Sequence, residues 1–179
     1  MSNQARTDAV SPHELARKSG FFTGEIPIAA AFPRLSPLVL ADGTVKVVLA
    51  FTRDEEGRTR VVGHATFTPR LQCQRCLEPV ERSLDVPIDL CVVASDEQAA
   101  EVAEELDAFV LTEDDVSIAE LVEDDLLLAL PSQVCNAYEE CPNRPDLNYP
   151  VDDGSGTSER DPARPNPFGV LAGLKNRGN

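Results

Sequence analysis

The chain has 179 residues and a formal net charge of −15, with five Cys and no Trp. A chain of this length buries roughly 70% of its unfolded surface, so one hydrophobic core suffices without disulfides. No apolar run reaches the roughly 20 residues of a membrane helix, and the polar start lacks the apolar part of a signal peptide, so we expect a cytoplasmic protein without a membrane partner.

Three stretches alternate apolar and polar residues and predict successive strands of an antiparallel sheet. They cover residues 45–52, 58–71 and 83–92. The polar sequence between the first two predicts a hairpin turn with Gly57 at positive φ. Upstream, prolines interrupt residues 11–42, so we expect at best a short helix around 27–36 in that region.

Two capping boxes predict helices in the second half of the chain, because a Ser is followed three residues later by Gln or Glu. The box at Ser95 predicts a short acidic helix to about residue 103. The box at Ser117 predicts a helix at 117–130 that covers one face of the sheet. Between these helices, residues 109–111 predict a further strand.

The C-terminal part of the chain changes in composition. Residues 150–164 contain almost nothing to bury and predict a flexible linker. Beyond the linker, residues 165–179 form an amphipathic segment, in which a two-turn helix aligns Phe168, Leu171 and Leu174. So short a helix needs a surface to bind, either the protein's own sheet or a partner.

These elements define the expected fold class and domain boundaries. We expect a single α+β domain over residues 1–149, with a loosely ordered N-terminus. Its antiparallel sheet has about four to six strands and is open or barrel-like. A covering helix packs on the sheet, and a short C-terminal helix follows the linker.

The C-x2-C motif of Cys73 and Cys76 stands at a strand end, where a turn lets both thiolates face one tetrahedral zinc ion. The remaining ligands of a candidate structural zinc site are Cys135 and Cys141, whose C-x5-C spacing is wider than usual. Two other interpretations stay open: a redox pair, which here lacks its normal βαβ surroundings, and thiols that bind no metal. Cys91 lies within a predicted strand, as a small core residue does.

No residue pattern points to catalysis. His13 and His64 have no Ser or Cys nucleophile at a recognisable spacing, and structural roles are the simpler interpretation. Adjacent carboxylates such as Asp124 and Asp125 point about 100° apart on a helix, so they do not chelate one Mg²⁺. We therefore expect neither an enzyme nor a small-molecule substrate.

The acidic charge is concentrated in one block. Residues 83–143 contain 17 acidic side chains and no Lys or Arg, whereas residues 1–82 contain 11 basic and 9 acidic ones. Because an acidic surface repels phosphate groups, any contact with RNA is expected within residues 1–82. The block itself is either a solubilising surface or a docking surface for a basic protein.

Three sequence blocks together resemble the YceD family, the large ribosomal RNA subunit accumulation proteins. They are LQCQRCLEP at 71–79, IAELVEDDLLLALP at 118–131 and PNPFGVLAGLK at 165–175. The resemblance implies a bacterial cytoplasmic factor needed for synthesis, processing or stability of 23S ribosomal RNA. It also implies that Cys135 and Cys141 occupy a region where family members place a His or Cys and a further Cys.

Two modes of action fit this resemblance, and we expect the first, with the second as the alternative. In the first, a non-enzymatic factor binds precursor 23S ribosomal RNA directly through arginines of the three-strand region, which by charge and position are Arg53, Arg58, Arg60, Arg70, Arg75 and Arg82. In the second, an acidic adaptor or chaperone binds a basic large-subunit ribosomal protein and affects 23S ribosomal RNA indirectly. The acidic block favours the second mode physically.

Overall fold

The computed structural model describes residues 9–102, 106–135, 137 and 139–144. These residues all belong to the first of two units, Met1–Pro145 and Asp146–Asn179, into which the chain divides by its internal contacts. The expected linker at 150–164 and the C-terminal segment at 165–179 lie outside the described residues and stay predictions.

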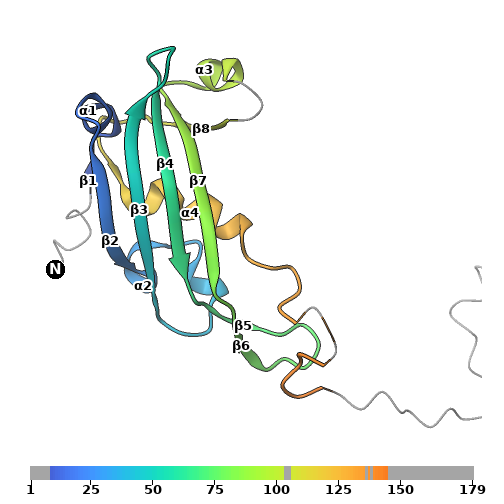
Figure 1. Ribbon diagram of the computed structural model, residues 1–179. Coiled ribbons are helices and arrows are strands. Elements are labelled where there is room, and N and C mark those ends of the chain that lie inside the picture. The colour runs from blue at the N-terminus through green and yellow to red at the C-terminus, as the bar shows by residue number, and fades with distance from the viewer. Residues whose placement is uncertain (1–8, 103–105, 136, 138, 145–179) are drawn as a thin grey trace, which may run out of the picture. The chain divides into compact units, whose positions relative to one another are not determined.

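A five-stranded sheet with the strand order β2-β3-β4-β7-β8 forms the centre of the fold (Figure 1). Its strands are β2 (Phe21–Pro27), β3 (Thr44–Arg53), β4 (Thr59–Phe67), β7 (Leu84–Val93) and β8 (Asp107–Val110). Neighbours from β2 to β7 are antiparallel, whereas β8 runs parallel to β7. Since β2 and β8 do not pair with each other, the sheet is open rather than a barrel. The expected α+β class and strand number are confirmed.

Two small sheets complete the strand pairing of the described residues. In the first, β1 (Ala9–Val10) pairs with β9 (Val116–Ser117). In the second, β5 (Arg70–Gln72) pairs with β6 (Pro79–Glu81). The β5–β6 hairpin continues the chain from the end of β4 to the start of β7, and it projects beyond the main sheet (Figure 1).

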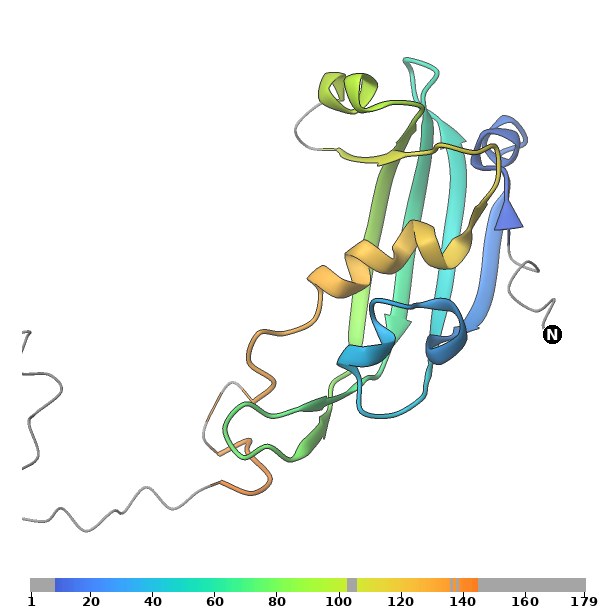
Figure 2. The ribbon, with the colours of Figure 1, turned by 180° about the vertical axis from the view of Figure 1, so that it is seen from behind.

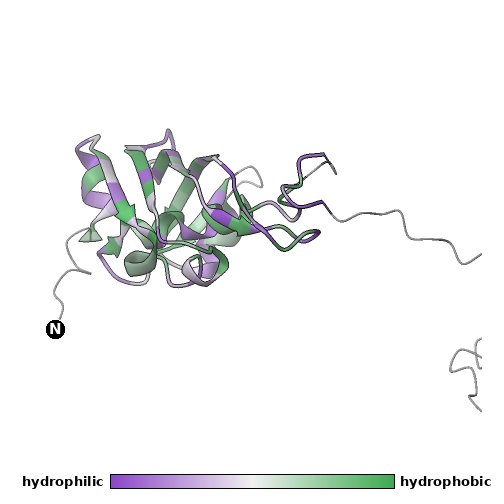
Figure 3. Cartoon of the chain, turned by 90° about the horizontal axis from the view of Figure 1, so that it is seen from below, coloured by the Kyte–Doolittle hydropathy of each residue, from purple (hydrophilic) through white to green (hydrophobic). Residues whose placement is uncertain are grey.

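The alternation that predicts the strands also decides which side chains are buried. In β3, Val45, Val47, Leu49 and Phe51 are fully buried, and the residues between them point to the other face of the sheet. The same alternation appears as green and purple bands along the strands in Figure 3. The hairpin turn after β3 has Gly57 at φ 80°, as expected.

Helix α4 covers the buried face of the sheet and crosses in front of the strands in the view of Figure 2. The helical elements are α1 (Pro12–Arg17), α2 (Ile28–Ala31), η1 (Ser36–Leu38), α3 (Asp96–Glu101) and α4 (Ile118–Leu128). Both serine N-caps are confirmed, because Ser95 and Ser117 accept hydrogen bonds from the backbone N–H groups three residues later. None of the helices in the described ranges is long and apolar enough to cross a bilayer.

The N-terminal region is more regular than the prolines suggest. Residues 11–42 contain α1 and the edge strand β2 in addition to α2, where we expected only a short helix around 27–36. Strand β2 forms because each of its residues pairs with β3 and Ile26 is buried in the core. The predicted strand at 58–71 is divided into β4 and β5, since Pro69 has no N–H for a continuous ladder.

Candidate metal centre and its surroundings

The C-x2-C motif forms the turn of the β5–β6 hairpin. The backbone N–H of Cys73 donates to Glu78 O at 2.9 Å, and the N–H of Leu77 donates to Cys73 O at 2.9 Å. Leu77 has φ 62°, a left-handed conformation that residues other than Gly, Asn and Asp rarely adopt. The turn buries Cys73 and leaves Cys76 half-buried.

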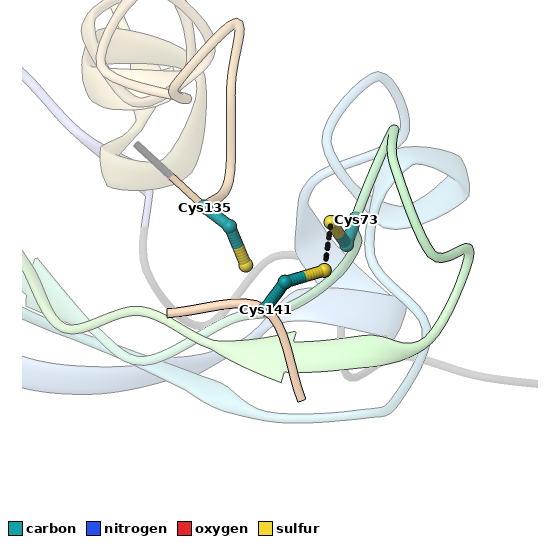
Figure 4. Close-up of side chains that lie close together, drawn as sticks. All are labelled: Cys73, Cys135 and Cys141. Atoms are coloured by element: carbon teal, nitrogen blue, oxygen red, sulfur yellow. Dashed lines mark hydrogen bonds between the residues drawn. The ribbon is translucent and has the colours of Figure 1, made fainter. Parts of the chain in front are cut away.

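Two further cysteines reach this turn from the segment that follows α4. The sulfur atoms of Cys73, Cys135 and Cys141 lie within 4.8 Å of one another, and all three side chains are buried. The Sγ atoms of Cys73 and Cys141 are 3.7 Å apart (Figure 4). The fold therefore brings Cys135 and Cys141 to Cys73 despite the wide spacing of the second pair, whereas Cys76 lies outside this group of three sulfur atoms.

The sulfur geometry fits a tetrahedral zinc ion. Zinc–sulfur bonds of about 2.3 Å place the ligand sulfurs about 3.8 Å apart, close to the separation of Cys73 and Cys141. Cys76 packs against this cluster, and its side chain interacts with that of Cys141. The donor set is therefore three converging thiols with Cys76 adjacent as the fourth.

The surroundings of the cluster favour one thiolate and disfavour the others. Backbone N–H groups of Cys76 and Arg75 point at Cys73 Sγ and lower the pKa of this thiol from 9.0 to about 6. Hydrogen bonding from Cys76, with burial, raises the pKa of Cys141 to about 12, and burial raises the pKa of Cys135. A bound divalent cation removes this conflict, because it stabilises several thiolates at once.

Polar side chains of the hairpin hold the segment after α4 in place. Arg82 Nε donates to Val134 O at 2.7 Å, and Arg75 donates to Ala137 O at 3.0 Å. Gln74 Oε1 accepts from the N–H of Val134 at 3.0 Å. Two of the arginines that we expected to contact RNA are therefore used to position Cys135 and Cys141.

The six candidate RNA-binding arginines fall into two groups. Arg53, Arg58 and Arg60 lie near the β3–β4 turn, whereas the other three lie in or next to the β5–β6 hairpin at the other end of the sheet (Figure 1). The acidic partners outside the cysteine region are Asp54 and Glu56 for Arg58, Asp89 for Arg60 and Glu81 for Arg70. Arg53 has no ion-pair partner among the residues that the structure describes.

The histidines and paired acids have structural surroundings. His13 Nδ1 lies 2.8 Å from the hydroxyl of Thr59, which is buried, and His64 is exposed on the sheet. Asp124 forms an ion pair with Arg34 at 2.6 Å. Within the described ranges, the cysteines form the cluster suited to a metal ion, and these acids do not.

Comparison with known proteins shows the family. A model of the family described as large ribosomal RNA subunit accumulation protein YceD matches residues 61–175. The chain belongs to the YceD family. A Haemophilus influenzae protein named "Large ribosomal RNA subunit accumulation protein YceD" is 30% identical over 140 residues, or 78% of this chain and 77% of the relative. No solved structure matches the chain.

The three sequence blocks that resemble the YceD family all lie within the matched region, so the resemblance is confirmed. The same region contains the cysteine cluster and the β5–β6 hairpin that carries the C-x2-C motif. In this chain, the matched region therefore covers most of β4 together with β7, α4 and the hairpin with its cysteines.

Sequence reasoning missed an apolar groove next to the cysteine cluster. The groove has a volume of about 510 Å³ and is lined by residues of η1, the hairpin and the segment after α4. One signal of the groove was available in the sequence. A Leu stands directly after the C-x2-C motif, at a turn position suited to Gly. The groove itself depends on three segments that are distant in the sequence, so alternation and spacing do not reveal it.

Proposed function

We propose that the chain is a non-enzymatic factor in the accumulation of large-subunit ribosomal RNA and that it acts by binding. Family membership supports the process, and the relative's name states the same role for that protein. Ribosomes are assembled in the bacterial cytoplasm, which is where we place this activity. The described residues that bear on chemistry are engaged in structural contacts, which supports binding over catalysis.

The partner that the geometry supports best is a basic ribosomal protein of the large subunit. The observation that carries this proposal is that acidic side chains or backbone carbonyls already engage Arg58, Arg60, Arg70, Arg75 and Arg82. An arginine beside a carboxylate offers phosphate less net charge. The block of 17 acids at residues 83–143 offers a basic protein a complementary surface.

Direct binding to precursor 23S ribosomal RNA is the second candidate, because one observation favours it. Arg53 lies at the end of β3 without an ion-pair partner among the described residues, and Arg58 and His13 line the same pocket. At this pocket, only Arg53 would offer phosphate a positive charge that no carboxylate offsets. We therefore rank it below the protein partner.

Titrations of the purified full chain distinguish the two partners. We expect binding to at least one individually purified basic protein of the large subunit, and negligible affinity for protein-free fragments of precursor 23S RNA. If RNA is the partner, its affinity falls steeply with salt, and Arg53→Gln reduces the slope of log K against log salt by about one. Tight RNA binding without any protein binding would reverse our ranking.

We also propose that Cys73, Cys76, Cys135 and Cys141 hold a structural zinc ion. The sulfur separation and the hydrogen-bonded hairpin support this donor set. Zinc there would join the hairpin to the segment after α4, because ligands come from both.

Elemental analysis of protein purified without chelator tests the zinc site. We expect about one zinc per chain, lost in Cys135→Ala. The matched control is Cys91→Ala, because Cys91 is buried in β7 away from the cluster and its loss should leave the zinc content unchanged. Wild-type protein without zinc, or equal zinc in both variants, would refute the assignment.

A further inference from the structure

An apolar groove lies between three segments at the hairpin end of the sheet. Its volume is about 510 Å³. Gln72 and Gln74 line part of the groove, and its apolar lining residues are Leu38, Leu71, Leu77, Leu130, Pro131 and Val134. Buried Cys73 forms part of the same wall, so the groove and the candidate metal centre share the hairpin. The metal centre would therefore also hold the groove in shape.

The groove presents apolar side chains to solvent. Leu38 is 53% exposed and Leu77 is 65% exposed, although both belong to a wall with buried Leu71. Large apolar side chains gathered around a concavity are typical of an interaction site in soluble proteins.

The backbone conformation of Leu77 also supports an interaction site. Its φ is 62°, a value that Gly adopts freely but that costs conformational energy for a Leu residue. The chain thus carries an exposed Leu at a position where folding alone favours Gly. The side chain is therefore better explained by a contact outside the fold than by packing within it.

The electrostatics of the groove favour a cationic occupant. Helix α4 ends directly before Leu130 and Pro131, and its last turn contains no basic residue. No basic residue of the last turn of α4 therefore offsets the negative end of its dipole, which attracts Lys or Arg. On the hairpin side, Glu78 follows Leu77 and is exposed. Two arginines near it are held within the fold, Arg75 by Ala137 O and Arg82 by Val134 O and Glu140. An apolar anchor flanked by basic residues matches both features.

We infer that this groove binds a large apolar side chain of a basic protein, with Lys or Arg next to that side chain in the partner. The inference rests on the proposed function, since it locates the contact with the basic ribosomal protein. The apolar anchor supplies most of the affinity, because it leaves water on both partners. The neighbouring charges select for a cationic segment.

The test uses the full chain, immobilised, and the proteins extracted with lithium chloride from purified large ribosomal subunits as the probe. Retained proteins are identified and quantified by mass spectrometry. Two variants alter the groove: Leu77→Gly removes the side chain at a φ that suits Gly, and Leu38→Glu adds a charge at an exposed wall position. The matched control is Leu128→Ala, which removes an 85% exposed Leu of α4 that does not line the groove.

We expect both groove variants to lower the affinity for the retained basic protein about tenfold, while the control keeps it. Thermal unfolding of Leu77→Gly should occur at the same or a higher temperature than in the wild type, which separates binding from folding. If the wild type and both variants retain the basic protein equally, the inference about the groove is wrong and the proposed function stays intact. Retention of no ribosomal protein by the wild type would instead refute the proposed partner.

Two other occupants have distinct outcomes in the same experiment. A second copy of the chain would give a wild-type dimer in sedimentation that Leu77→Gly converts to a monomer. If RNA occupies the groove, the wild type would bind precursor 23S fragments and both groove variants would lose affinity for them. Either result would overturn the inference.

Discussion

Asp125 lies in α4 beside two other carboxylates and partly away from solvent. Burial, with Asp107 and Asp124 nearby, raises the pKa of Asp125 from 3.8 to about 6. Its Oδ2 atom is buried without a hydrogen-bond partner within the described part of the chain. The ionised side chain therefore destabilises the folded state at neutral pH.

Replacing Asp125 with Asn should stabilise the protein at pH 7. The raised pKa means that the folded state binds the proton of Asp125 more tightly than the unfolded state does. The ionised carboxylate therefore destabilises the folded state fully above about pH 6 and not at all below about pH 4. A shift of this size corresponds to about 3 kcal/mol, which partial contact with solvent reduces to about 1 kcal/mol. Urea unfolding of Asp125→Asn at pH 7 and pH 4 measures the gain and its disappearance.

The control for this measurement is Asp114→Asn, because Asp114 is exposed in the loop before β9. It should change the free energy of unfolding by less than about 0.5 kcal/mol at either pH. A gain for Asp125→Asn that persists at pH 4 would show that the raised pKa is not its cause.

At the scale of elements, the central strands β3 and β4 approach each other closely at Gly63. A Cβ atom added at Gly63 would fall on the carbonyl oxygen of Val48. Gly63→Ala should therefore separate the strands or break their ladder, at a cost of about 3 kcal/mol or more. Val62→Ala is the matched control, since Val62 is 42% exposed and its loss leaves the backbone undisturbed.

Chemical denaturation of both variants measures this difference. A Gly63→Ala protein as stable as the wild type would mean that the strands separate at no cost. The contact would then not explain the glycine.

Much of the fold was predictable from local patterns. Alternation predicts β3, β4 and β7, and the serine caps predict α3 and α4, because these signals lie within a few residues of one another. Strand β2 was missed because Gly24 and Pro27 obscure its alternation, and only pairing with β3 makes it a strand. A local pattern carries no information about such a distant partner.

The candidate site was predictable in composition but not in arrangement. The four cysteines are visible in the sequence, yet their convergence depends on Gln74, Arg75 and Arg82 holding a segment about 60 residues away. The sequence likewise does not show the arrangement of Glu123. This buried carboxylate accepts hydrogen bonds from the backbone N–H groups of Arg34 and Leu35. Charge counts make Arg75 and Arg82 candidates for contact with RNA, whereas their hydrogen bonds to the segment after α4 become visible only in the structure.

At the scale of the whole molecule, the main sheet and the cysteine region should differ in their need for metal. The main core joins the sheet to α4, whereas the cysteines form a separate buried cluster with little apolar packing. A two-stranded hairpin of this size is marginal without such support. Removing the metal should therefore loosen residues 70–82 and 131–144 and spare the sheet.

Hydrogen exchange with and without a chelator tests this separation. We expect faster exchange in the β5–β6 hairpin and after α4, with β3 and β4 unchanged. Exchange that rises equally in all strands would show that the main core also depends on the metal. Exchange that does not change anywhere would show that the cluster is stable without it.

The central claim is that the molecule acts by holding a basic protein of the large subunit. Crosslinking in living cells, with sequencing of attached RNA and mass spectrometry of attached proteins, tests it most directly. The account predicts crosslinks from the groove side to a basic large-subunit ribosomal protein and few crosslinks to precursor 23S RNA. Dense RNA crosslinks around Arg53, with no ribosomal protein attached, would contradict it.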